Sequence, residues 1–110
     1  MKIVLTSDGQ SEDAEVDERF GRCQFFAIFD TEDSTLTYHK NEGQASSQGA
    51  GIASSQFIAD QGANVLITGR VGPKALQGLE GANIKMFKGD GMTLSAAIDA
   101  YKQGLLRDLR

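Results

Sequence analysis

The stretch Val65–Thr68 (VLIT), followed at once by Gly69–Pro73 (GRVGP), decides the fold class. An unbroken apolar, β-branched run between turn residues predicts a short strand buried on both faces. Proline suits the first turn of a helix, because the N–H that it lacks would have no partner there, so a short helix is expected from Pro73 to near Gly81. A strand that leads directly into a helix is typical of α/β proteins with parallel strands.

The rest of the chain repeats this pattern of short apolar strands and amphipathic helices. Strands are expected over Lys2–Thr6, Phe25–Asp30, Thr35–His39 and Ile84–Phe87, the middle two as a β-hairpin with Leu36 and Tyr38 on one face of its outer strand. A helix is expected from Gly49 to Asp60 after a polar segment, Asn41–Gly51, and a closing helix with Thr93 as its cap is marked by Leu94, Ala97, Ile98, Tyr101 and Leu105. The predicted order is βββαβαβα, with a mixed five-stranded sheet and helices on its faces.

Size, charge and cysteine content narrow the class of protein. A chain of 110 residues fits one domain, 1–110. Its net charge of −4 disfavours nucleic acid and anionic lipid as partners, and no apolar run approaches the roughly 20 residues that span a membrane. The single cysteine excludes an internal disulfide and a four-cysteine metal site, and Met1–Val4 runs straight into a strand, so a cytoplasmic location is expected.

Five loops are expected to meet at one edge of the sheet, since ligands of parallel sheets bind beyond the carboxyl ends of the strands. The loops after the first, fourth and fifth strands open there, and the hairpin brings its two outer ends to the same rim. These loops and the helix starts beside them carry many cations: Arg19, Arg22, His39, Lys40, Arg70, Lys74 and Lys88. The sequence therefore predicts a glycine-lined pocket of positive potential that suits an anionic small ligand.

Several motifs in order along the chain resemble one known family. They are Arg19–Cys23 (RFGRC) followed by Phe26 and Asp30, then Asn41, Gly49–Ala53 (GAGIA), and Gly69–Ala75 (GRVGPKA) with Leu79. Together they resemble the dinitrogenase iron-molybdenum cofactor biosynthesis family over essentially the whole chain. The resemblance implies a three-layer ribonuclease-H-like fold and, in members that serve nitrogen fixation, transient binding of an iron-molybdenum-sulfur cluster or its precursor. Those members typically have histidine before the Phe-Gly pair, where this sequence has Arg19.

The candidate site residues come from these loops. Cofactor-binding residues are expected to be Arg19, Phe20, Gly21, Arg22, Asn41, Gly69 and Gly72, and metal ligands to be Cys23 and His39. Arginines suit anions, and Arg22 would favour the thiolate form of the cysteine. Each has a structural alternative: the arginines pairing with Asp17 and Glu18, the cysteine as a small core residue, the histidine idle at the surface, and the asparagine satisfying its own loop.

The function expected is binding without catalysis. The hypothesis is a non-enzymatic carrier for an anionic metal-sulfur cluster, iron-molybdenum-cofactor-like or a related iron or molybdenum sulfide, working with cluster-assembly proteins or an ATPase. The alternative is a protein-interaction or regulatory module that acts with a partner such as an ATPase, without metal. A nuclease is disfavoured because the central strands carry no cluster of carboxylates. No nucleotide is expected, since Ser54 replaces the third glycine of a dinucleotide fingerprint after Gly49-Ala50-Gly51. The sequence leaves the oligomeric state open.

Overall fold

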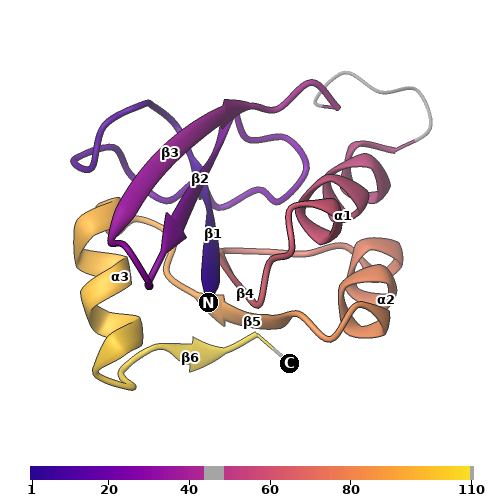
Figure 1. Ribbon diagram of the computed structural model, residues 1–110. Helices are drawn as coiled ribbons and strands as arrows, with labels where there is room; N and C mark the ends of the chain where they lie inside the picture. Colours follow the sequence, from indigo (N-terminus) through magenta and orange to yellow (C-terminus); the bar gives the residue numbers. More distant parts are fainter. Residues whose placement is uncertain (44–48, 110) are drawn as a thin grey trace.

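The computed structural model describes residues 1–43 and 49–109 as one mixed sheet flanked by helices (Figure 1). The strands are β1 (Lys2–Ser7), β2 (Phe25–Asp30), β3 (Thr35–Lys40), β4 (Val65–Thr68), β5 (Lys85–Lys88) and β6 (Arg107–Asp108). The helices are α1 (Ala50–Asp60), α2 (Pro73–Gly81) and α3 (Leu94–Lys102). Within the described residues, no helix has the length and apolar character needed to cross a membrane.

The strands lie in the order β3-β2-β1-β4-β5-β6. β4 runs parallel to both β1 and β5, whereas β2 is antiparallel to β1 and to β3, as expected for a hairpin joined to a parallel core. Helix α2 carries the chain from β4 to its parallel neighbour β5, whereas α1 leads from the edge strand β3 to β4 in the middle of the sheet. The carboxyl ends of β1, β4 and β5 therefore open at the same edge of the sheet.

Side chains of the central strands alternate between two hydrophobic cores. Val4 of β1 and Leu66 of β4 pack with α1 and α2, where Ile58 and Leu79 are fully buried. Their neighbours in sequence point to the opposite face and pack against α3, in a cluster that includes Ile3, Leu5, Val65, Ile67, Leu94 and Ala97. This alternation explains why the runs KIVLT and VLIT are apolar at nearly every position. The result is the expected three-layer α/β arrangement, with α1 and α2 on one face and α3 on the other (Figure 1).

Two expectations about the end of the chain were wrong. In the described part of the chain the sheet has six strands and not five, because Arg107–Asp108 pairs antiparallel with Phe87–Lys88 of β5, and the element order becomes βββαβαβαβ. Two exposed, charged residues give no hydrophobic pattern from which such a strand could be predicted. The closing helix is capped by the Thr93 side chain as expected but ends at Lys102, and Leu105 is 69% exposed beyond it because Gly104 turns the chain with φ 72°. Residues 44–48 of the predicted polar segment lie outside the described part of the chain.

Candidate functional site

The loops meet at one rim, as the sequence predicted. Ser7 at the end of β1 pairs with Phe25 at the start of β2, which pairs with Lys40 at the end of β3. Thr68 and Lys88 end β4 and β5 side by side. The segments 8–24, 41–43, 69–72 and 89–93 therefore all leave the sheet from the same edge.

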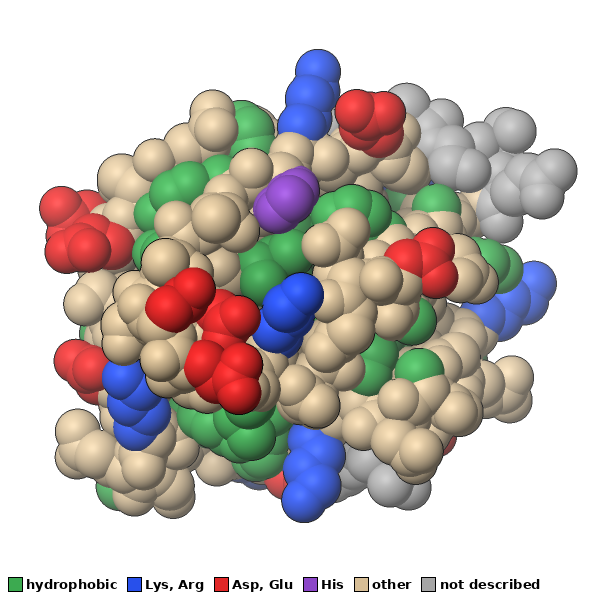
Figure 2. All heavy atoms as spheres, viewed as in Figure 1, with side chains coloured by type: hydrophobic (Ala, Val, Ile, Leu, Met, Phe, Trp, Pro, Cys, Tyr) green, Lys and Arg blue, Asp and Glu red, His purple; other side chains and the backbone are tan. Residues whose placement is uncertain are grey.

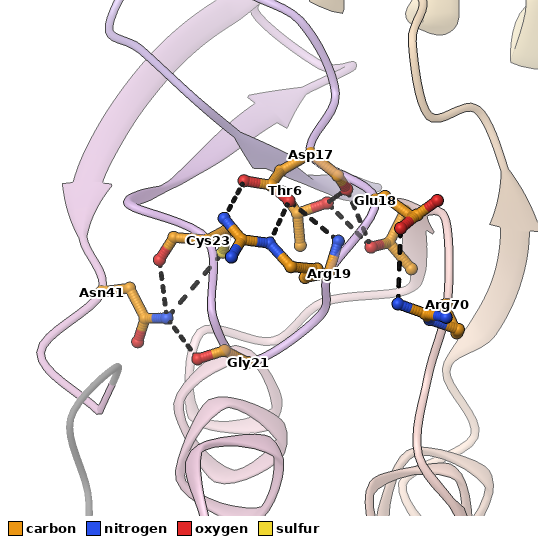
Figure 3. A network of polar contacts seen from close by, with 9 residues as sticks. Thr6, Asp17, Glu18, Arg19, Gly21, Cys23, Asn41 and Arg70 are labelled. Carbon is orange, nitrogen blue, oxygen red and sulfur yellow. Dashed lines mark hydrogen bonds and ion pairs between the residues drawn. The ribbon is translucent and has the colours of Figure 1, made fainter.

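Two of these segments are joined by backbone hydrogen bonds. The Arg70 N–H donates to the Glu18 carbonyl at 2.7 Å, and the Phe20 N–H donates to the Arg70 carbonyl at 3.2 Å. Gly69 permits this approach, since a Cβ there would lie 2.7 Å from the Glu18 Cα. Beneath the junction, the Thr6 hydroxyl donates to the Asp17 carbonyl at 2.6 Å (Figure 3). Gly69, predicted to bind a cofactor, is buried and serves the junction of the two loops.

A second junction fixes the loop around Gly21 on the start of α1. Gly21 has φ 97°, and a Cβ on it would lie only 2.8 Å from the Gly51 nitrogen. The Asn41 amide nitrogen donates to the carbonyls of Gly21 at 2.9 Å and Cys23 at 3.0 Å, and its oxygen accepts the Gly43 N–H at 3.1 Å. Asn41 is 3% exposed, so its polar atoms are used within the protein. Of the two roles considered for Asn41, the geometry supports the one in which it satisfies loop backbone.

A groove lies where α1 and α2 begin, and its described lining combines apolar side chains with glycines. Its volume is about 470 Å³, and its lining comprises Phe20, Gly49, Gly51, Ile52, Gly72, Pro73, Lys74 and Ala75. The two helices approach closely here, as a Cβ on Gly51 would lie 3.2 Å from the Ala75 Cβ. Both helices have glycine N-caps, Gly49 and Gly72, without a side chain to accept the first N–H groups. The first residues of both helices therefore line one groove, and neither N-cap residue offers a side chain to the first N–H groups.

The groups that line this groove suit an anionic ligand that is held without a bond between a protein side chain and a metal. Its described lining contains no cysteine, histidine, aspartate or glutamate, and its charged residue is Lys74 at the start of α2. Ile52 is 47% exposed, an unusual position for a large aliphatic side chain, and it stands with Phe20 as the apolar wall. Helix amides and a lysine attract negative charge, while the apolar wall favours a weakly hydrated surface.

The rim is less positive than the sequence predicted. The Arg19 guanidinium lies 3.3 Å from the Asp17 carboxylate, Arg70 lies 3.4 Å from Glu18, and Lys88 lies 2.7 Å from Asp90. Each of these cations is matched by an acid two residues away or across the loop junction. The pairing alternative considered for Arg19 is therefore the observed one, and Arg22 is exposed outside the groove lining.

Cys23 lies in the core beneath the rim. It is 0% exposed and packs in the same cluster as Phe20 and Phe26. Burial, reinforced by the negative charge of Asp17, raises the pKa of the Cys23 thiol to about 12. The expectation that Arg22 favours the thiolate was therefore wrong, because desolvation dominates at this position. A neutral thiol is a poor metal ligand, so this conformation supports the core role of the cysteine.

The Cys23 thiol of the native protein is expected to react with a disulfide reagent such as DTNB at pH 8 roughly a thousandfold more slowly than that of the unfolded chain, whose cysteine has a pKa near 8.5. The absorbance change, followed with and without denaturant, measures the reaction rates of the unfolded and the native chain. Comparable rates would show that the cysteine is accessible in the native state.

The raised pKa of Cys23 also means that native stability falls as the pH rises from about 8.5 toward 12, because only the unfolded chain then holds the thiolate.

His39 lies at a separate cavity. This cavity of about 610 Å³ is lined in part by His39, Lys40 and Phe57, and the histidine ring is 5.8 Å from that of Phe57. Figure 2 shows hydrophobic surface beside the histidine on this face. Neither Cys23 nor His39 lines the groove at the helix starts, and among the described residues no three acidic, cysteine or histidine side chains are grouped to hold a metal ion.

Sequence reasoning overlooked the contribution of α1 to the groove. Gly49, Gly51 and Ile52 were considered only as part of a motif or of a dinucleotide fingerprint. The available signal was that both helices begin at glycine, in GAG and in VGP, because a glycine N-cap leaves helix amides open to a ligand. Their convergence depends on the packing of α1 against α2, which no local pattern encodes.

The fold and the groove define a small three-layer α/β protein with a ligand-sized groove at the carboxyl edge of its sheet. Residues 1–104 match the family described as dinitrogenase iron-molybdenum cofactor, and the chain belongs to this family. It is 38% identical to the orange protein from Desulfovibrio gigas, whose apo form superposes with a TM-score of 0.92 over 97% of this chain and 91% of that one.

Two further relatives extend this similarity to other organisms. A NifB-type protein from Thermotoga is 31% identical, with a TM-score of 0.86 over 98% of this chain and 92% of that one. An uncharacterized protein from Methanocaldococcus jannaschii is 28% identical over 96% of this chain and 89% of its own length. The family and these neighbours associate the chain with metal-cluster or cofactor binding.

Proposed function

We propose that this protein is a non-enzymatic carrier for an anionic metal-sulfur cluster, which it holds in the groove between the starts of α1 and α2. The observation that carries the proposal is the donor set of the groove: two uncapped helix N-termini and Lys74, with no metal-ligating side chain in its described lining. Such a site holds a preformed anionic cluster through contacts with the outer surface of the cluster. It does not build a cluster from bare metal ions.

The chemistry of a sulfide-covered cluster matches the groove. Its charge is spread over large sulfur atoms, which accept weak hydrogen bonds and are poorly hydrated. Backbone amides at helix starts supply such hydrogen bonds, Lys74 supplies charge, and Phe20 with Ile52 covers the sulfur surface. The cluster class is therefore the iron-molybdenum cofactor or a related iron or molybdenum sulfide. Membership of the dinitrogenase cofactor family supports this choice, as does a relative described in an apo form.

A carrier needs binding and release, and the site offers groups for both without a catalytic one. The Cys23 thiol is buried and protonated, and His39 lies at another cavity. Release would pass the cluster to a cluster-assembly protein or an ATPase-driven partner, the partner class that the family implies. The open position of the groove at the sheet edge suits such a transfer.

A bulky residue at Gly72 is expected to block binding without harming the fold. Gly72 lines the groove, a Cβ on it would meet no atom within 4 Å, and its φ of −71° and ψ of 163° suit any residue. The metal-free protein is incubated without oxygen with iron-molybdenum cofactor and, separately, with tetrathiomolybdate plus copper. Gel filtration with elemental analysis then measures metal in the protein peak, which Gly72→Phe should lose.

Gly81→Phe is the matched control, because a Cβ at Gly81 also meets no atom within 4 Å but lies at the other end of α2. Stoichiometric metal with wild type and Gly81→Phe, but not with Gly72→Phe, supports a carrier that uses this groove. Equal binding by all three proteins would move the site elsewhere. Absence of metal from every protein peak would overturn the carrier and favour the protein-interaction alternative.

A further inference from the structure

Two arginines lie next to groove residues in the sequence, and each is paired with an acidic residue of segment 8–24. Arg19 precedes Phe20 of the groove wall, and Arg70 lies two residues before Gly72. Their backbones lie next to one another, since Arg19 and Arg70 form an isolated parallel bridge. Figure 3 shows Arg19 turned toward Asp17 and Arg70 turned toward Glu18, with Arg70 on the loop that leads into α2.

The two ion pairs differ in how firmly the acid is held. Asp17 is anchored, because its side chain is 11% exposed and its carboxylate also accepts the Arg19 backbone N–H at 2.8 Å. The pair between Arg70 and Glu18 is open, with the two side chains 74% and 57% exposed and a single contact of 3.4 Å. An exposed pair of this kind contributes little to stability and can separate by side-chain rotation alone.

We infer that Glu18 is a built-in counter-ion that competes with the anionic ligand for Arg70, and so sets the affinity of the groove. This inference rests on the proposed function of the groove. In the ligand-free protein Glu18 neutralises Arg70, and on binding the guanidinium turns from Glu18 to the ligand while the backbone junction of residues 18–20 with 69–71 stays in place. Glu18 is thus a specificity-determining residue for the charge of the ligand.

This exchange favours multiply charged ligands over singly charged ones. A monoanion offers Arg70 no more charge than Glu18 already does, and Glu18 has the advantage of being tethered. A cluster with two or three negative charges attracts the guanidinium more strongly and also gains from Lys74 and the helix starts. The Glu18 carboxylate, once displaced, remains tethered close to Arg70 and competes for it again, which facilitates release of the ligand to a partner.

The test is a double-mutant cycle with tetrathiomolybdate as the probe, measured by equilibrium dialysis without oxygen at low ionic strength. Glu18→Gln is expected to lower the Kd by roughly threefold or more, in line with the strength of exposed ion pairs, and Arg70→Ala to raise it. In the combined Glu18→Gln, Arg70→Ala protein the gain from removing the carboxylate should disappear, because its partner is gone. Added chloride serves as the competing monoanion, and it should compete more effectively with the probe in Glu18→Gln than in wild type.

Asp90→Asn is the matched control, since it frees Lys88 from a rim ion pair of 2.7 Å and changes the net charge by the same amount. An equal gain in Asp90→Asn, or a gain from Glu18→Gln that persists without Arg70, would reduce the effect to general repulsion and overturn the competition. Wild-type binding with no change in Glu18→Gln would overturn the inference and leave the carrier standing. Absence of binding by every variant would overturn both.

Discussion

Gly21→Ala is expected to lower the free energy of unfolding by roughly 3 kcal/mol, a large part of the stability of a domain this size. Two costs add at this position. The φ of 97° is one that side chains rarely adopt, and the new Cβ would lie 2.8 Å from the Gly51 nitrogen and 3.0 Å from the Ala50 carbonyl carbon. Backbone atoms of a helix cannot step aside as a flexible side chain can, so the loop must lift from α1.

Gly62→Ala separates the two costs. Gly62 has φ 77°, but a Cβ there meets no atom within 4 Å, so only the backbone penalty of about 1 kcal/mol remains. Urea unfolding followed by circular dichroism measures both variants. If Gly21→Ala is no less stable than Gly62→Ala, the close packing of the loop on α1 does not exist in solution.

The loss at Gly21 also tests the role assigned to Asn41. The Asn41 amide donates to the Gly21 carbonyl, so a displaced loop breaks that hydrogen bond as well. Asparagine at the end of a strand is compatible with ligand contact or with loop support, and the sequence offered no way to choose. The choice depends on the positions of Gly21 and Cys23, which lie 20 and 18 residues earlier in the chain, respectively.

The central fold was predictable because burial and sequence agree there. The run VLIT is apolar at each buried position, and Pro73 marks the start of α2 as a local feature of the chain. The sixth strand was not predictable, since the pairing of Arg107 and Asp108 comes from the neighbouring edge of β5 and not from their own side chains. Short exposed edge strands carry little hydrophobic information.

The sequence predicted where the candidate site lies but not how its charged residues are paired. Strand order brings the loops to one rim, and that follows from the pattern of strands and helices. Charge pairing does not follow from it, because Glu18 meets Arg70 only through the junction between two distant loops. Cys23 shows the same limit: its neighbour Arg22 indicated a reactive thiol, whereas its burial in the core raises its pKa.

Lys74→Glu is expected to weaken binding of a multiply charged cluster at low salt by about a hundredfold, the largest effect expected from a change of charge alone. Lys74 is the second residue of α2, it is exposed, and none of the ion pairs seen among the described residues involves it. Replacing it with glutamate changes the local charge by two units beside the groove. At a separation of roughly 6 Å in water, each unit is worth about 0.7 kcal/mol per ligand charge, so a dianion loses close to 3 kcal/mol.

Lys85→Glu makes the same change in net charge at the opposite end of the sheet, because Lys85 begins β5 while the groove lies beyond the ends of the strands. Its effect on the Kd should be small and should vanish at 0.15 M salt, since its distance from the groove exceeds the screening length of about 8 Å. Equilibrium dialysis of both variants against tetrathiomolybdate gives the ratio of their Kd values. A ratio near one would mean that the ligand responds to the overall charge of the protein, and the groove between α1 and α2 would no longer be the site. A large ratio that persists at 0.15 M salt locates the anion beside Lys74, because only a nearby charge remains effective when the solution screens the rest.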